Sequence, residues 1–148
     1  MALPEPPPPG TTMLPAGTFA GTAVVVTGGG TGLGKAIAVE FARLGAAVGI
    51  VSRAEAHRQA GIEAVQSVGG RAVGAAADIR KAEEVAAAFD AVEAALGPVG
   101  VLVNNAAANF PVPADDLSPN GWRAVTQIVL DGTFFCSQEL CRRARDGG

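Results

Sequence analysis

A glycine-rich turn over residues 28–34 is the part of this sequence whose residue types and spacing point most directly to chemistry. It reads Gly-Gly-Gly-Thr-Gly-Leu-Gly, follows an apolar run and precedes an amphipathic one. Gly28, Gly32 and Gly34 can adopt positive φ, let the backbone approach a phosphate and let a helix pack tightly on a sheet. The N-terminus of the helix that follows offers unpaired N–H groups and a positive dipole end to an anion. The turn therefore predicts a site for the pyrophosphate of a dinucleotide.

Two alternatives to a dinucleotide site are open for this turn. A nucleoside triphosphate loop ends in Gly-Lys-Ser or Gly-Lys-Thr, whereas Gly34-Lys35 is followed here by Ala36, so no hydroxyl is placed for a magnesium ion. The turn could also join a strand to a helix in another α/β protein without binding anything. The order of strand, turn and helix is the one that the dinucleotide motif requires, and it favours the first interpretation.

Polar residues follow the other apolar runs, where the carboxyl ends of parallel strands would meet the same ligand. An NAD site usually has an acid for the ribose hydroxyls after the second strand, whereas this chain has Ser52-Arg53. A guanidinium and a hydroxyl suit a 2′-phosphate, so NADP(H) is favoured over NAD(H), with a merely solvated Arg53 as the alternative. Asp78 could accept a hydrogen bond from an adenine amino group, or be an ordinary turn or cap residue. Asn105 could tie neighbouring strand ends together through its amide, and the small Ala106 would let the nicotinamide ribose approach.

The elements that must position these residues alternate between strand-like and helix-like runs. Strands are expected at Ala23–Thr27, Ala47–Val51, Arg71–Ala76 and Val99–Asn104, and helices at Leu33–Leu44, Ala54–Val68, Lys81–Leu96 and from Pro119 to about Arg145. Strands that are apolar throughout and separated by helices indicate a parallel sheet covered on both faces. The predicted fold class is therefore α/β, with a doubly wound parallel sheet of the Rossmann type.

Local signals mark the limits and the faces of these helices. Gly45 is a candidate C-cap of the first helix, and Ser118 can cap the last one with Pro119 at its first position. In the first helix, apolar residues recur at helical spacing at Leu33, Ile37, Phe41 and Leu44. In the third, a buried stripe is expected at Val85, Ala88, Phe89, Val92 and Leu96.

Composition and charge limit the class of protein. The 148 residues are 49% hydrophobic and 17% charged with a formal net charge of −3, which suits one soluble domain and gives no electrostatic reason to expect nucleic acid. No apolar run is long enough to span a bilayer, and the first basic residue is Lys35, so the basic start of a secretory signal is missing. We expect a cytoplasmic protein without a nucleic-acid or membrane partner.

Three further features are expected to carry no chemistry. Residues 1–17 are rich in proline and have few apolar residues to anchor them, so a disordered tail is expected, and Met13 could be the true start in place of Met1. Cys136 and Cys141 have no accompanying histidine or second cysteine pair, which favours ordinary thiols over a metal site or a disulfide. His57 lies in a polar stretch and is expected on a solvated helix surface.

The combination of these motifs resembles a known family. In this order and spacing, Thr27 to Gly34, Asp78-Ile79 and Asn104-Asn105-Ala106-Ala107 are similar to the cofactor half of the short-chain dehydrogenase/reductase family. The resemblance covers about residues 18–148 and implies a partial NAD(P)-binding Rossmann domain whose last helix can make a homo-oligomer. The NADP(H) site that it implies is lined by Gly28, Gly30, Thr31, Gly32, Leu33, Gly34, Ser52, Arg53, Asp78, Ile79, Asn105 and Ala106. Segments 105–110, 117–122 and 128–134 are most similar to 2,4-dienoyl-CoA reductases, which implies NADPH-dependent reduction of an unsaturated acyl thioester.

The sequence departs from the family pattern at two points. Val129 stands where most members carry an asparagine that helps hold a water and the catalytic lysine; the dienoyl-reductase branch lacks this relay too, and helix packing is the other explanation. The family's catalytic serine and Tyr-x-x-x-Lys segment follow the last helix, and this chain contains no tyrosine. We therefore expect a fragment truncated after the helix that follows the fourth strand, with no catalytic or metal-binding residue of its own.

The expected truncation has consequences for stability and for function. The strand Val99–Asn104 would be an apolar open edge, because a fifth strand pairs with it in the complete fold. The chain alone is then expected to bind NADP(H) weakly, to aggregate and not to turn over substrate. Two alternatives are a non-catalytic dinucleotide-binding module that evolved at this length and a fragment of a 3-oxoacyl or ketone reductase.

Overall fold

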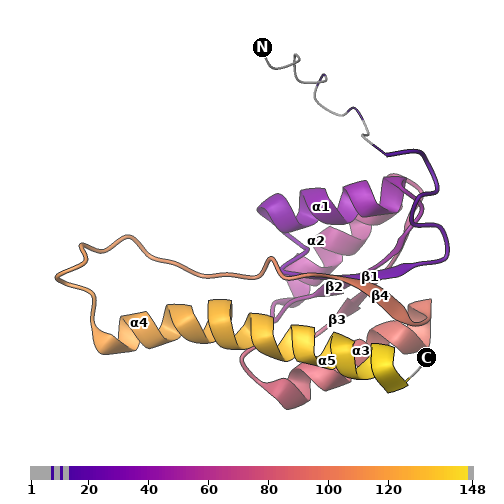
Figure 1. Cartoon of the computed structure of the whole chain (residues 1–148). Helices are drawn as coiled ribbons and strands as arrows, with labels where there is room; N and C mark the ends of the chain where they lie inside the picture. The colour runs from indigo at the N-terminus through magenta and orange to yellow at the C-terminus, as the bar shows by residue number, and fades with distance from the viewer. Residues whose placement is uncertain (1–7, 9–10, 12–13, 147–148) are drawn as a thin grey trace, which may run out of the picture.

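The computed structural model describes residues 8, 11 and 14–146, and its centre is a four-stranded parallel sheet (Figure 1). The strands are β1 (Ala23–Thr27), β2 (Ala47–Val51), β3 (Arg71–Ala75) and β4 (Val99–Val103), in the spatial order β3-β2-β1-β4. The chain runs outward from β1 to β3 and then crosses to the other side of β1. This order confirms the expected doubly wound sheet and puts its switch point between β1 and β4, where such sheets bind ligands.

Helices cover both faces of the sheet (Figure 1). α1 (Gly32–Arg43) and α2 (Glu55–Gln66) pack on one face, and α3 (Ala82–Leu96) and α5 (Gly132–Asp146) pack on the other. Successive side chains of β1 divide between two cores, with Val24 and Val26 on the side of α1 and α2, and Val25 on the side of α3 and α5. A strand that is buried on both faces needs apolar side chains at every position, which explains the unbroken apolar runs in the sequence.

Helix α1 packs through its small residues. Gly34, Ala38 and Ala42 are its buried positions, whereas Leu33 is 79% exposed. Small side chains let the helix backbone lie close to the strands, so the larger apolar residues that recur at helical spacing do not form the main packing face. Ile37, Phe41 and Leu44 instead line a shallow apolar groove together with Leu14 and Phe19.

The other helix signals agree closely with the structure. The stripe predicted for α3 is buried at Val85, Ala88, Phe89 and Val92. Gly45 follows the end of α1 with a φ of +95°, and the Ser118 hydroxyl accepts the N–H of Gly121 at 3.0 Å. Expected boundaries differ by one or two residues; β3 and β4, for example, each end one residue earlier than predicted.

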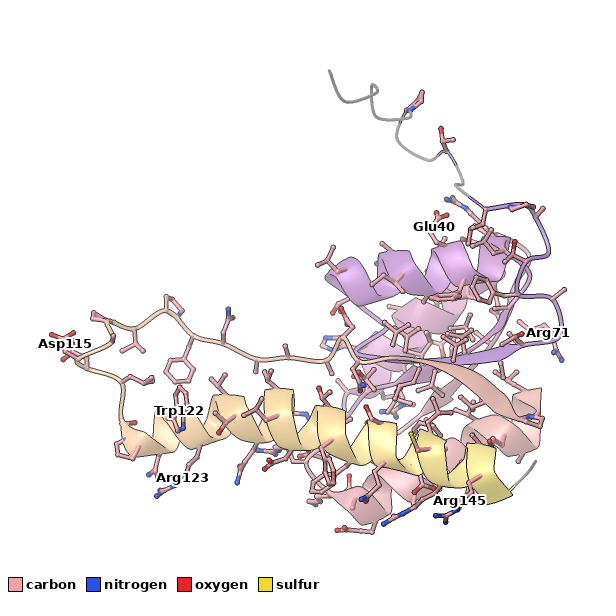
Figure 2. All side chains as sticks on the ribbon, in the orientation of Figure 1. Glu40, Arg71, Asp115, Trp122, Arg123 and Arg145 are labelled. Atoms are coloured by element: carbon pink, nitrogen blue, oxygen red, sulfur yellow. The ribbon has the colours of Figure 1, made fainter. Side chains whose placement is uncertain are left out.

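The expected last helix is interrupted by a π-helical turn. It consists of α4 (Pro119–Thr126), the π turn η1 (Gln127–Asp131) and α5. α4 and the extended segment before it project away from the sheet, with Asp115 near the tip and Trp122 on α4 (Figure 2). No residue of α4 is buried, whereas Cys136 in α5 is. A π turn inserts a residue into the helical repeat, so the faces of α4 and α5 are not in register.

Arg143 anchors α5 to α3 through charge and packing. Its guanidinium donates hydrogen bonds to Asp90 at 2.8 Å and to Glu93 at 2.6 Å on α3, and to Glu139 on α5 at 2.8 Å. The same group lies 5.5 Å from the ring centroid of Phe89, within the range of a cation–π contact. The half-buried cation is therefore surrounded by partners that α3 and α5 both supply.

The edge and the ends of the described chain complete the fold. β4 pairs with β1 alone among the described residues, and the amide of Asn104, just past its end, donates to the Ser137 hydroxyl at 3.0 Å. Met13 and most of the tail expected over residues 1–17 lie outside the described residues. Between residues 14 and 146, no helix has both the length and the apolar character needed to cross a membrane.

Candidate functional site

A cavity of about 410 Å³ lies at the carboxyl ends of the strands. The turn after β1, the end of β2 and the segments after β3 and β4 form its walls. Of the expected site residues, all except Gly30 line it, namely Gly28, Thr31, Gly32, Leu33, Gly34, Ser52, Arg53, Asp78, Ile79, Asn105 and Ala106. The other lining residues are Val51, His57, Ala77, Ala107 and Ile128.

The glycine turn leaves the N-terminus of α1 open to the cavity. Gly28 and Gly32 have φ values of +66° and +49°, a region that favours glycine. Thr31 is the N-cap, but its hydroxyl makes no capping hydrogen bond, and the first turn of α1 contains no acidic residue. The first N–H groups of α1 therefore have no acceptor from a capping side chain, and an anion in the cavity can accept from them.

Gly34 and Gly30 are required by close packing rather than by positive φ. A Cβ at residue 34 would lie 2.4 Å from both the Asn105 amide nitrogen and the carbonyl oxygen of Gly28. A Cβ at residue 30 would lie 1.8 Å from the carbonyl oxygen of His57. Gly30 is buried, does not line the cavity, and allows the first turn of α2 to pack against the glycine turn.

Thr27 and Asn105 join the ends of β1 and β4. The buried Thr27 hydroxyl accepts the N–H groups of Asn105 and Ala106, both at 3.0 Å, and is 3.3 Å from the Val103 carbonyl oxygen to which it donates. The Asn105 side-chain amide donates to the Thr27 carbonyl at 2.9 Å. These bonds confirm the tie expected of Asn105. They also show that Thr27 is its main partner, which no motif in the sequence indicates.

The Asp78 carboxylate is held by Arg80. The Arg80 Nε donates to both carboxylate oxygens, at 2.9 and 3.0 Å, and the Asp78 N–H donates to Glu84 at 2.7 Å. Hydrogen bonding to Arg80 is the main reason that the pKa of Asp78 is lowered to about 2, and the charge of Arg53 adds to the shift. Asp78 is thus an ionised acceptor at neutral pH, with an orientation that Arg80 sets.

Ser52 and Arg53 continue directly from β2 into the cavity wall. The Ser52 N–H donates to the Ala75 carbonyl at 3.2 Å, and the Gly28 N–H donates to the Val51 carbonyl at 2.8 Å. Sheet-like bonds therefore hold this segment between β1 and β3. Arg53 is exposed, yet it lines the cavity, and its charge acts on Asp78 across it.

Five lining residues are absent from the expected site, and two of them, His57 in α2 and Ile128 in η1, come from helical segments. His57 is exposed, as expected, but the packing of its backbone on Gly30 brings it to the cavity. The glycine at residue 30 is therefore the feature of the sequence that could have indicated this contact. Ile128 reaches the cavity from the π turn. Helix α5, which follows the π turn, can pack closely on Ile79 because its first residue is glycine. A Cβ at Gly132 would lie 2.6 Å from the Ile79 side chain. Val129 is 38% exposed and does not line the cavity.

The arrangement suits a long ligand with several chemical parts. Its volume lies within the range of about 300–1,000 Å³ that is common for small-molecule sites. An open helix N-terminus favours phosphate, Arg53 favours a second anion, and the Asp78 carboxylate can accept from an amino group. Ile79, Ala106 and Ile128 add an apolar wall. A dinucleotide fits this donor and acceptor set.

Known proteins that are similar to this chain are oxidoreductases. Residues 22–148 match the model of the short chain dehydrogenase family. The uncharacterized oxidoreductase F53C11.3 of Caenorhabditis elegans is 46% identical over 132 residues, which make up 88% of this chain and 42% of that protein. A probable 2,4-dienoyl-CoA reductase of Bacillus subtilis is 40% identical over 120 residues, 81% of this chain and 47% of that protein. The chain spans a little under half the length of these curated relatives.

Solved structures agree with the fold. A citronellol catabolism dehydrogenase of Pseudomonas aeruginosa superposes with a TM-score of 0.83 at 32% identity, over 89% of this chain and 54% of that one. A short chain dehydrogenase from Bacillus anthracis superposes with a TM-score of 0.80 at 35% identity, over 86% and 53% of the two chains. The expected resemblance, including the one to 2,4-dienoyl-CoA reductases, is confirmed.

Proposed function

The chain belongs to the short chain dehydrogenase family, and on that premise we propose that its cavity binds NADP(H) as the cofactor-binding part of a reductase. The observation that carries the choice of cofactor is Ser52-Arg53 directly after β2, where both residues line the cavity and neither of them is acidic. An acidic residue there would repel a 2′-phosphate, whereas a guanidinium and a hydroxyl donate to it.

Each part of the proposed cofactor has a matching set of residues. The open N-terminus of α1, after the turn Gly28–Gly34, would bind the pyrophosphate. Arg53 and Ser52 would bind the 2′-phosphate, and Asp78 would accept from the adenine amino group. Asn105 keeps the ends of β1 and β4 together, and Ala106 leaves room for the nicotinamide ribose. When bound, the cofactor supplies the hydride of the reduction.

The cofactor proposal is tested by titrating the chain with NADPH and NADH. Loss of a charge-assisted hydrogen bond is worth about 1.5–3 kcal/mol, or roughly a tenfold to hundredfold change in affinity. We expect tighter binding of NADPH, and we expect Arg53→Gln to remove most of that preference. Arg71→Gln changes an exposed arginine at the opposite end of the sheet and is the matched control (Figure 2). Equal affinity for both cofactors in the unaltered chain would contradict the proposal.

An unsaturated acyl thioester is the substrate class that we propose for the complete reductase. The support is the similarity to a protein named as a probable 2,4-dienoyl-CoA reductase, at 40% identity. Reduction of a carbon–carbon double bond needs a proton as well as a hydride. The chain contains no tyrosine to donate this proton as the family's motif does, and we assign the proton donor to no residue of the described cavity wall. The 148-residue chain is therefore expected to leave NADPH unoxidised with a dienoyl thioester or with a ketone, and turnover would contradict this assignment.

A non-catalytic dinucleotide-binding module is the second candidate function. The observation that favours it is that residues of this chain alone form the cavity at the carboxyl ends of the strands. Such a module should bind NADPH with a dissociation constant of about 10 μM or less, roughly −7 kcal/mol, in isolation. Much weaker binding would favour the first candidate function, in which the chain is the cofactor-binding part of a larger reductase.

We also propose that the outer surface of α4, η1 and α5 is an oligomer contact. Trp122, Leu130 and Phe134 are 60%, 63% and 56% exposed, and apolar side chains of this size on one helical segment indicate a covered surface. Light scattering after size exclusion should show a dimer or larger species. Leu130→Lys should shift it towards the monomer, and an unchanged mass would contradict the contact.

A further inference from the structure

The side chain of Arg58, in the first part of α2, holds the turn that carries Ser52 and Arg53. Its Nη1 donates to the Ser52 carbonyl at 2.8 Å and to the Arg53 carbonyl at 2.8 Å. One nitrogen that bridges two successive carbonyls fixes the planes of both peptide groups. Because the Ser52 N–H is bonded to β3, the segment is restrained through its donor and its acceptor groups alike.

The aliphatic stem of Arg58 has a place of its own on the sheet. A Cβ at Gly74 would lie 3.1 Å from the Arg58 Cβ and 3.5 Å from its Cδ, so the stem crosses β3 where β3 has no side chain. Arg58 is half-buried, and its N–H is bonded at 3.1 Å to the carbonyl of Ala54, the N-cap of α2. The guanidinium is thus delivered to the end of β2 from a fixed helix, over a surface that accommodates it.

The bonds of Arg58 are made to the backbone and not to an acid. None of the ion pairs among the described residues includes Arg58. Its guanidinium is hydrogen-bonded to the carbonyls of Ser52 and Arg53. An arginine that made no contact with the rest of the protein would keep its guanidinium in water. This one gives up side-chain freedom to order two residues of the cavity wall, although it does not line the cavity itself.

We propose that Arg58 is a positioning residue for recognition of the 2′-phosphate of NADP(H). It orders the turn at Ser52 and Arg53 before the cofactor binds, so that the Arg53 guanidinium meets the phosphate without an ordering cost. Arg58 acts through Arg53 and makes no contact with the cofactor. This inference rests on the proposed NADP(H) site.

The test is a double-mutant cycle on the 148-residue chain, followed by calorimetric titration with NADPH and with NADH. Arg58→Leu keeps the stem over Gly74 and removes both hydrogen bonds to the turn. We expect it to weaken NADPH binding roughly tenfold and NADH binding less than about twofold, because NADH has no 2′-phosphate. Since Arg58 acts through Arg53, the double variant with Arg53→Gln should bind NADPH no more weakly than Arg53→Gln alone.

Two further variants and an exchange measurement separate positioning from general stability. Arg58→Lys retains a donor of similar reach and should restore part of the NADPH affinity, whereas Arg71→Leu should leave the ratio of the two affinities unchanged. Amide hydrogen exchange without cofactor should be faster at residues 52–56 in Arg58→Leu than in the unaltered chain. If Arg58→Leu does not fold, Arg58→Lys carries both the titration and the exchange measurement, with smaller changes of the same sign.

The outcomes distinguish this inference from the cofactor proposal. Additive losses in the double variant would mean that Arg58 binds the phosphate itself, and they would overturn the inference. So would equal losses for NADPH and NADH, or an unchanged exchange rate at residues 52–56. A chain that shows NADPH preference through Arg53 but no effect of Arg58 contradicts this inference alone. A chain that binds neither dinucleotide contradicts both.

Discussion

The hydroxyl of Thr27 holds the ends of β1 and β4 together beside the cavity, and the effect of removing it can be predicted in detail. Thr27→Val replaces the hydroxyl by a methyl group of similar volume, so no packing defect is introduced. The Asn105 and Ala106 N–H groups then lose their 3.0 Å acceptor, and the weaker 3.3 Å bond to the Val103 carbonyl is lost as well.

The magnitude follows from these lost partners. A buried donor left without an acceptor costs about 1–3 kcal/mol, so two of them set an upper range of about 2–6 kcal/mol. Asn105 and Ala106 are half-buried, and water can recover part of this loss. We expect a net decrease of about 2 kcal/mol in the free energy of unfolding. With a urea slope of about 1–3 kcal/mol per molar, the unfolding midpoint should fall by roughly 1 M.

Urea unfolding followed by circular dichroism measures this decrease, with Thr27→Ser as the matched control. Thr27→Ser retains the hydroxyl and loses a buried methyl group, which costs about 1 kcal/mol. Thr27→Val should therefore be the less stable of the two, and it should also bind NADPH more weakly, because Asn105 and Ala106 line the cavity. A valine variant as stable as the serine variant would refute the reasoning that this hydroxyl ties β1 to β4.

Three further predictions concern residues around the same framework. Gly34→Ala should lower the free energy of unfolding by more than about 3 kcal/mol, because the added Cβ would lie 2.4 Å from two atoms. Gly32→Ala adds a Cβ in open space at a φ of +49°, so it should lower the free energy of unfolding by about 1 kcal/mol, and thermal unfolding compares the two variants. The pKa of Asp78 is lowered to about 2 from 3.8, so the ionised carboxylate stabilises the folded state by about 1 kcal/mol above pH 4. This stabilisation is lost as the pH falls towards 2, and a carboxylate titration by NMR checks the pKa. Arg143→Leu should destabilise the fold by about 3 kcal/mol because it takes the nearest cation away from the half-buried carboxylates of Glu93 and Glu139. Arg142→Leu, whose side chain is exposed and lies 3.9 Å from Glu139, should cost less than about 0.5 kcal/mol, and urea unfolding compares the two variants.

The sheet and most of the cavity wall could be predicted because their signals are local in the sequence. A strand buried on both faces is an unbroken apolar run, and the residue after it falls at the carboxyl edge of the sheet. The positions of Ser52, Arg53, Asp78 and Asn105 after the predicted strands therefore indicate that all four lie at the carboxyl edge of the sheet. The structure brings all four to the cavity.

The remaining features depend on contacts that local patterns do not record. Helix α1 packs through Gly34, Ala38 and Ala42, and small side chains carry a weaker hydrophobic signal than Leu33, which is exposed. The π turn inserts one residue, which a period of 3.6 cannot reveal over a short segment. His57 reaches the cavity through a backbone contact with Gly30, so its side chain gave no warning of its position.

The most direct test of the proposed NADP(H) site is an amide chemical-shift map of the isotopically labelled chain during titration with NADPH. The largest shift changes should fall in the glycine turn at residues 28–34, at Ser52 and Arg53, and at Asp78 and Asn105. NADH should produce the same pattern with smaller changes at Ser52 and Arg53. Changes confined to the apolar groove beside α1, or none at saturating NADPH, would contradict the account.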